Sequence, residues 1–316
     1  MNLDALVEGV LAGRRAEIGR AITLVESRQV DHFDAAAELL RRLAPHAGGA
    51  QRIGLTGVPG VGKSTFIERF GLYVIEQGHR VAVLAVDPTS SRTGGSILGD
   101  KTRMERLSRH DAAFIRPSPA GATLGGVAAR SREAMLICEA AGFDVVIVET
   151  VGVGQSEWAV SQMTDVFVLL LLAGAGDELQ GIKRGIMELA DIVVINKADG
   201  EGEAAALRAV QTFRSALKLL HAHDAAWRPT VHAASALTGQ GLEQTWARIG
   251  EHRAALEAEG LLTARRADQR VRWMWDAVED RLAQRLRAGA AYQEIEAQVR
   301  AGTLPPTAAA RQVLDD

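Results

Sequence analysis

The run "GVPGVGKST" has the residue types and spacing of a phosphate-binding loop, G-x-x-x-x-G-K-[ST]. An apolar segment typical of a strand precedes it, and a segment with helical spacing follows. Its glycines let backbone N–H groups face a β-phosphate, and the following helix adds the positive end of its dipole. We expect Lys63 to reach the β- and γ-phosphates and Ser64 to bind Mg²⁺. The predicted phosphate-loop residues are Gly57, Gly60, Val61, Gly62, Lys63, Ser64 and Thr65.

The motif "NKAD" predicts which base is bound. A carboxylate at Asp199 can accept hydrogen bonds from guanine N1–H and the 2-amino group. Adenine has neither donor, and a buried polar group left unpaired is costly, so the motif favours GTP and GDP. A backbone N–H of the later loop "ASALTGQG" is placed to donate to guanine O6. The predicted guanine-site residues are Asn196, Lys197, Asp199, Ser235, Ala236 and Leu237.

Three acids are predicted to hold the magnesium ion together with Ser64. Asp87 and Glu149 each end an apolar strand, and Asp100 lies in the Gly-rich stretch "TGGSILGDKTRM". Mg²⁺ takes oxygen ligands, with few carboxylates and several waters. Asp100 is also compatible with a solvated loop acid or a helix N-cap.

The stretch "VIVETVGVGQSE" raises the question of what positions the attacking water. Val153, not Gln, follows Gly152, so we expect slow hydrolysis by the protein alone. Completion by a partner or a loop would raise the rate. Lys183 in "GIKRG" is a candidate charge donor, with a solvated helix lysine as the alternative. The predicted catalytic residues are thus Lys63, Glu149 and Lys183.

The elements that must position these residues alternate between strands and helices. Apolar strands are predicted near residues 52, 81, 112, 144, 165, 191 and 230. Such alternation predicts an α/β fold with a mostly parallel central sheet, helices on both faces and ligands at the carboxyl ends of the strands. We predict an N-terminal helical segment (1–50), a P-loop G domain (51–250) and a C-terminal helical arm (251–316).

Charge and apolar patterning limit the classes of partner that we expect for this chain. The net charge of −3 gives no electrostatic reason to expect nucleic acid or an anionic membrane. The longest apolar run is too short for a membrane span, and the N-terminus lacks a signal-peptide pattern, so we expect a cytoplasmic protein. Apolar residues of the arm, from Val271 to Leu286, form one stripe that needs a partner surface and predicts a homodimer; packing on the chain's own domain is the alternative.

Several motifs together resemble the MeaB/ArgK family, GTPases associated with methylmalonyl-CoA mutase. They are "TGVPGVGKST", "AVDPTSSRTGGSILGDKTRM", "IRPSPAGATLGGVA", "VIVETVGVGQSE", "GAGDELQGIK" and "NKADG". The resemblance covers residues 1 to about 290 and is most specific over 53–199. It implies a GTP-hydrolysing chaperone that gates cofactor loading and protects an adenosylcobalamin-dependent acyl-CoA mutase. It also implies a homodimer through the arm and a third switch in "GAGDELQGIKRGI" that senses the mutase.

Other functions remain open at this point. A nickel-insertion GTPase would need a Cys or His cluster, and the chain has one cysteine and scattered histidines. A kinase of a transport-system binding protein would need a phosphoacceptor base and a substrate groove, neither of which the sequence identifies. A nucleotide-dependent scaffold whose turnover is incidental is the non-enzymatic alternative.

Overall fold

The computed structural model describes residues 2–27, 29–86, 104–117, 124–150, 156–174, 184–220, 226–287 and 290–315. Three predicted site residues, Asp87, Asp100 and Lys183, lie outside these ranges. The chain divides into two compact units, Met1–Ala267 and Asp268–Asp316, which are described separately.

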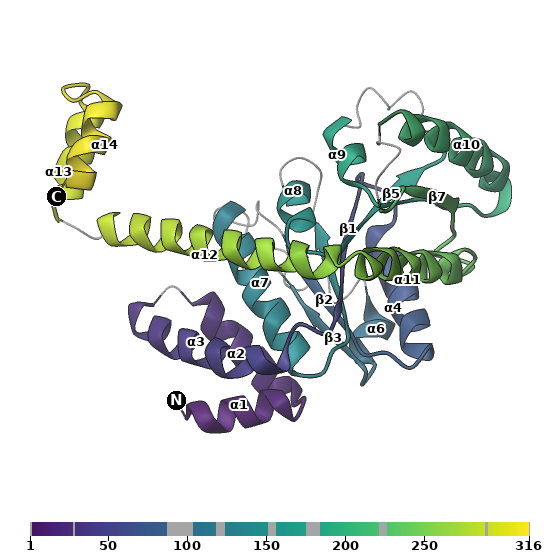
Figure 1. Cartoon of the computed structure of the whole chain (residues 1–316), viewed down its shortest axis with the longest axis horizontal. Coiled ribbons are helices and arrows are strands. Elements are labelled where there is room, and N and C mark those ends of the chain that lie inside the picture. Colours follow the sequence, from purple (N-terminus) through teal and green to yellow (C-terminus); the bar gives the residue numbers. More distant parts are fainter. Residues whose placement is uncertain are drawn as a thin grey trace. The chain divides into compact units, whose positions relative to one another are not determined.

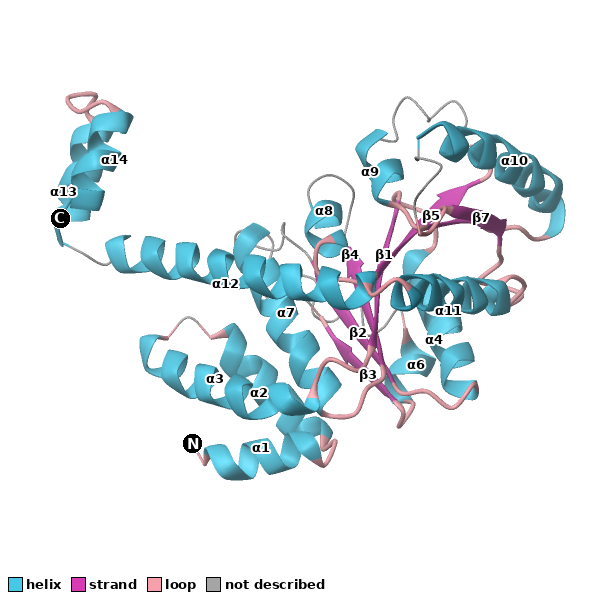
Figure 2. Cartoon of the chain, in the orientation of Figure 1, coloured by secondary structure: helices cyan, strands magenta, loops and turns pink. Residues whose placement is uncertain are grey.

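A seven-stranded parallel sheet forms the centre of the first unit (Figures 1 and 2). The predicted strands are all present, and the predicted fold class is confirmed. In chain order the strands are β1 (Gln51–Gly57), β2 (Val81–Val86), β3 (Ala113–Arg116), β4 (Val145–Thr150), β5 (Val166–Leu172), β6 (Ile192–Asn196) and β7 (Thr230–Ala233). Their spatial order is β3-β2-β4-β1-β5-β6-β7. The phosphate loop therefore leaves the central strand β1, with the end of β4 on one side and that of β5 on the other.

Helices cover both faces of this sheet, which explains why its strands are apolar throughout. Three helices pack on one face: α4 (Lys63–Glu76), α6 (Glu105–Arg109) and α11 (Leu242–Ala258). Among the described residues, the G domain also has α7 (Leu124–Ala140), α8 (Ser156–Ser161), α9 (Arg184–Leu189), α10 (Glu203–Leu220) and the short η3 (Gly200–Gly202). Residues of α9 and α10 form a second apolar cluster with β5, β6 and β7.

The N-terminal segment forms its own helical layer, as predicted. It consists of α1 (Leu3–Leu11), α2 (Arg15–Glu26), α3 (Val30–Leu43) and the short η1 (Ala44–His46). Apolar residues at helical spacing, among them Val10, Ile18 and Ile22, are fully buried. All three long helices contact α7, so this layer rests on a helix of the G domain (Figure 1).

The C-terminal helices complete the chain. Helix α12 (Leu261–Arg287) begins in the first unit and continues into the second, which also contains α13 (Ala290–Arg300) and α14 (Pro306–Asp315). Within the second unit, Val271, Trp275, Val278 and Leu282 of α12 are exposed by 56%, 56%, 46% and 48%. Among the described residues, no helix is both long and apolar enough to cross a membrane.

Candidate nucleotide-binding site

The phosphate loop has a backbone that side chains other than glycine would disturb. Gly62 has φ +89°, in the left-handed region, immediately before the first residue of α4. A Cβ added to Gly57 would lie 2.7 Å from the carbonyl oxygen of Leu170 on β5. This contact is with a backbone atom, so no side-chain rotation could relieve it. The loop therefore turns tightly against β5 and leads directly into α4.

Lys63 bends back over this loop. Its Nζ donates a hydrogen bond to the Gly57 carbonyl at 2.6 Å. Partial burial lowers the pKa of Lys63, while the carboxylates of Glu149 and Glu157 act in the opposite direction. The ammonium group is thus hydrogen-bonded to a neutral carbonyl, and the charges of two acids favour its protonated form.

The predicted base-binding motif contacts the phosphate loop directly. Asn196, at the end of β6, donates from Nδ2 to the Val61 carbonyl at 2.8 Å. Lys197 donates from Nζ to the Gly60 carbonyl at 2.8 Å. Lys197 also has φ +58°, and no other non-glycine among the described residues has a positive φ. Because an L-residue there is strained by about 1 kcal/mol, the contact with Gly60 helps to hold an uncommon backbone conformation.

Asp199 is oriented by the loop that follows β7. The Ser235 hydroxyl donates to Asp199 Oδ2 and accepts the Thr238 backbone N–H at 3.1 Å. In the same loop the Ala236 N–H donates to Asn196 Oδ1 at 3.3 Å. The two segments predicted to bind guanine are therefore joined by side-chain bonds, while Leu237 extends into solvent with 75% exposure.

Glu149 lies near the end of β4, between β1 and β2 in the sheet. Its register partners are Leu55 on β1 and Ala85 on β2, and it is 4% exposed. The next residue, Thr150, shares a 2.7 Å hydroxyl–hydroxyl hydrogen bond with Thr56, and both threonines are fully buried. This bond links the ends of β4 and β1 and fixes the strand that carries Glu149 relative to the phosphate loop.

Glu157 belongs to the same neighbourhood but was not among the predicted site residues. It lies in the first turn of α8, is 3% exposed, and acts on the charge of Lys63 together with Glu149. The sequence offered one signal for it. Glu157 is the last letter of "VIVETVGVGQSE", an acid eight residues after Glu149 and across a Gly-rich turn.

The described part of the chain thus brings together the phosphate loop, "NKAD", the loop Ser235 to Leu237, and Glu149. All of them lie at the carboxyl ends of parallel strands, where ligands bind in folds of this type. The arrangement can hold a nucleoside phosphate between β1 and β6 and can place acids beside its phosphates.

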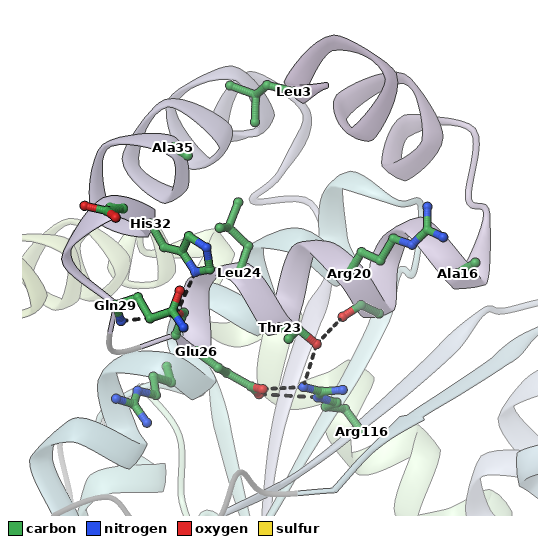
Figure 3. A pocket seen from close by; sticks show the side chains of 14 residues that line it. Leu3, Ala16, Arg20, Thr23, Leu24, Glu26, Gln29, His32, Ala35 and Arg116 are labelled. Atoms are coloured by element: carbon green, nitrogen blue, oxygen red, sulfur yellow. Dashed lines mark hydrogen bonds and ion pairs between the residues drawn. The ribbon is translucent and has the colours of Figure 1, made fainter. Parts of the chain in front are cut away.

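A hollow of about 1150 Å³ lies away from these loops (Figure 3). It is bounded by the N-terminal helices and by Arg116, the last residue of β3. Arg116 donates from Nε to Glu26 at 3.3 Å and from Nη2 to Thr23 at 3.4 Å. On the other side His32 Nδ1 and Ser27 Oγ are 2.8 Å apart. The Arg116 bonds join α2 to the sheet edge, so this hollow is part of the contact between the N-terminal layer and the G domain.

Known proteins resemble this chain over nearly its whole length. Residues 18–291 match the family described as "Methylmalonyl Co-A mutase-associated GTPase MeaB". A "Putative GTPase" of Caulobacter vibrioides is 58% identical, over 99% of this chain and 97% of its own. "GTPase ArgK" of Escherichia coli is 48% identical, over 95% of this chain and 92% of its own. The mitochondrial "Methylmalonic aciduria type A homolog" of Mus musculus is 45% identical, over 99% of this chain and 79% of its own.

The fold has a solved counterpart at similar coverage. The crystal structure titled "LAO/AO transport system kinase" superposes with a TM-score of 0.77 at 40% identity, covering 99% of this chain and 96% of that one. With the parallel sheet and the phosphate loop described above, these similarities place the chain in the MeaB family of P-loop GTPases, which bind and hydrolyse GTP.

Proposed function

We propose that this chain is a magnesium-dependent GTPase that acts as a chaperone of an adenosylcobalamin-dependent acyl-CoA mutase. Methylmalonyl-CoA mutase is the first choice of partner, and GTP turnover would gate cofactor loading and protect the mutase. The observation that carries the proposal is the match to the mutase-associated family over residues 18–291. The similarity to the methylmalonic aciduria type A homolog of Mus musculus supports the same partner.

In this proposal the described loops divide the nucleotide between them. Lys63 exchanges its bond to the Gly57 carbonyl for the β- and γ-phosphates, and the N–H groups of the glycine loop surround the β-phosphate. Asp199 accepts from N1–H and the 2-amino group of guanine, in the orientation that Ser235 gives it. Asn196 and Lys197 hold the base loop against the phosphate loop, so that both parts of the nucleotide are positioned together.

The described residues fit a magnesium ion. Glu149 is a buried carboxylate, and a buried charge needs a compensating partner. Ser64 supplies a hydroxyl oxygen from the first turn of α4, and both are the hard oxygen donors that Mg²⁺ prefers. We assign the ion to Ser64, Asp87, Asp100 and Glu149; bound there, it would neutralise phosphate charge.

The partner is proposed to supply what the free protein lacks. No glutamine follows Gly152, so the attacking water has no obvious positioning group and hydrolysis by the protein alone is slow. We assign the sensing of the mutase to Gly176 to Lys183, with Lys183 as the charge donor. Lys183→Ala is expected to leave basal turnover unchanged if its charge acts only in the complex.

A homodimer through the arm completes the proposal. The stripe of Val271, Trp275, Val278 and Leu282 exposes apolar side chains along α12, and a second copy of the stripe would remove them from water. Trp275→Glu should convert the dimer to monomers in sedimentation velocity. Arg272→Glu, a charge change at a neighbouring exposed position, is the matched control.

The decisive experiment measures GTP turnover with and without purified mutase. We expect methylmalonyl-CoA mutase to accelerate turnover by at least about tenfold, as completion of a GTPase site by a partner does. An isobutyryl-type mutase is the comparison, and the Lys63→Ala variant controls for contaminating hydrolase. Equal turnover with either mutase and with neither would reject the chaperone proposal while leaving the GTPase intact.

One structural relative favours a second candidate function. Its title describes a transport-system kinase, at 40% identity. A kinase would transfer the γ-phosphoryl group to a binding protein instead of water. Incubation with γ-labelled GTP and a basic-amino-acid binding protein distinguishes the two, because only the kinase leaves label on protein.

A further inference from the structure

Helix α8 connects the phosphate site to the first turns of α12. Its first turn carries Glu157, and it ends at Ser161. Figure 2 shows it beside β4, the strand that bears Glu149, and it contacts both β4 and β1. The short helix α8 therefore lies between the phosphate site and the first turns of α12.

The segment from Val160 to Thr164 is seated tightly on the central strand. A Cβ added to Gly54 of β1 would lie 2.7 Å from Thr164 Oγ1 and 3.0 Å from Val160 Cγ1. Thr164 in turn donates from Oγ1 to the Val160 carbonyl at 2.9 Å, closing the end of the helix. Because interiors are close-packed, a displacement at one end of such a helix moves the other end.

The far end of α8 is held by the first turns of α12. Arg265 donates from Nη1 to the Asp165 carbonyl at 2.8 Å and from Nη2 to the Ser161 carbonyl at 3.4 Å. Its neighbour Arg266 donates from Nε to Asp165 Oδ1 at 2.9 Å and from Nη2 to the Ala50 carbonyl at 2.6 Å. Both arginines therefore bond Asp165, Arg266 also reaches Ala50 next to β1, and Arg265 reaches the last residue of α8 at Ser161.

We propose that Arg265 is a positioning residue for GTP hydrolysis, acting through α8 to hold Glu157 in place beside Lys63. Glu157 and Glu149 are both buried acids whose charges act on the Lys63 ammonium group, so the field at Lys63 depends on where α8 lies. Arg265 sets that position from outside the nucleotide site, on the helix that continues into the arm. The proposal rests on the phosphate-binding role of Lys63 proposed above.

The experiment is a double-mutant cycle between Arg265→Ala and Glu157→Gln, with kcat, KM and GDP affinity measured for each variant. We expect Arg265→Ala to lower kcat about five- to tenfold, with GDP affinity within about twofold of wild type, because small misplacements reduce rate more than binding. In the Glu157→Gln background the same change should have little further effect. Arg265→Lys should recover part of the loss, since an ammonium group can still donate to one of the two carbonyls.

Three variants separate positioning from stability. Gly54→Ala places a methyl group against Thr164 and Val160, and against Phe167 of β5, without touching Arg265; it should lower both kcat and the melting temperature. Glu139→Gln removes a charge that pairs with Arg52 at the sheet's amino end, so it should lower the melting temperature and leave kcat unchanged. Arg253→Ala removes only an exposed pair with Glu257 and should behave as wild type.

The outcomes are distinct. Equal losses from Arg265→Ala in the wild-type and Glu157→Gln backgrounds would overturn the proposal, as would an unchanged kcat in Arg265→Ala. If Lys63→Ala retained full turnover, the proposed phosphate site itself would fail, whatever Arg265 does.

Discussion

The two ends of the β-sheet satisfy their charged and polar side chains differently. At the amino end, buried charges meet opposite charges: Arg52 pairs with Glu139, and Arg266 pairs with Asp165. At the carboxyl end, Lys63, Asn196 and Lys197 donate to neutral backbone carbonyls. A bond from an ammonium or amide group to a neutral carbonyl lacks the opposite charge that a carboxylate supplies in an ion pair. The carboxyl end is therefore built from contacts that a phosphate or a base can replace.

This difference separates stability from function along one set of strands. Removing one partner of a buried pair leaves an uncompensated charge, so changes at the amino end should unfold the protein. Changes at the carboxyl end remove groups that act on the ligand and should alter turnover with little change in stability.

The largest expected effect is on turnover at the carboxyl end. Lys63→Ala should lower GTP hydrolysis by at least about 10³-fold, the scale of losing a cationic group that stabilises phosphoryl transfer. Its melting temperature, measured by circular dichroism, should stay close to wild type, because the hydrogen bond of Lys63 goes to the neutral Gly57 carbonyl at the end of β1. Lys218→Ala, at an exposed position on α10, is the control. Global loss of structure in the Lys63 variant would contradict the comparison.

The next effect is on stability at the amino end. Arg266→Met should lower the free energy of unfolding by about 3 to 5 kcal/mol, because Asp165 would keep a buried charge without its guanidinium partner. Urea titration measures the loss, with Arg253→Met as the exposed control. GDP affinity of the folded fraction should be unchanged. A stability close to wild type would mean that the Arg266–Asp165 pair contributes no more than a surface pair.

Base selectivity should change next. Asp199→Asn should lower GDP affinity about 10²-fold and favour xanthosine diphosphate, because an amide can donate to the 2-keto oxygen of xanthine. Glu201→Gln, two residues on and exposed, should change neither. Calorimetry with both nucleotides measures the ratio, and an unchanged preference for guanine would remove Asp199 from the base site.

The sequence predicted the strands and the motifs at their ends because both depend on local patterns. Apolar runs identify buried parallel strands, and a phosphate loop needs glycines and a lysine within nine residues. The contacts between motifs depend on three-dimensional packing instead. That Asn196 bonds to Val61, or that Ser235 orients Asp199, requires strands far apart in the sequence to lie side by side.

Glu157 and the amino-end pairs show the same limit more sharply. Arg52 and Glu139 are 87 residues apart, and Asp165 and Arg266 are 101 residues apart, with no motif connecting either pair. An isolated acid or arginine in a sequence is usually solvated. Only the fold reveals which of them are buried against one another.

The smallest expected effect is a change in how stability depends on pH, at a residue away from both ends of the sheet. Glu133 on α7 has its pKa raised to about 7, chiefly by burial and also by Glu26, while Arg130 and Arg132 lower it. The folded state therefore binds this proton more tightly than the unfolded state, and its contribution to stability is lost as the pH rises through about 7.

Glu133→Gln removes the ionisable group. From pH 5 to pH 8 the free energy of unfolding of the variant should rise by about 2 kcal/mol relative to that of wild type. This is less than the full pKa shift implies, because the carboxyl group keeps some contact with solvent. Urea titrations at both pH values measure this, with the exposed Glu105→Gln as control. If the difference in free energy of unfolding between variant and wild type stays constant with pH, Glu133 titrates like a solvated acid. The packing of α7 against α2 would then not bury its carboxyl group.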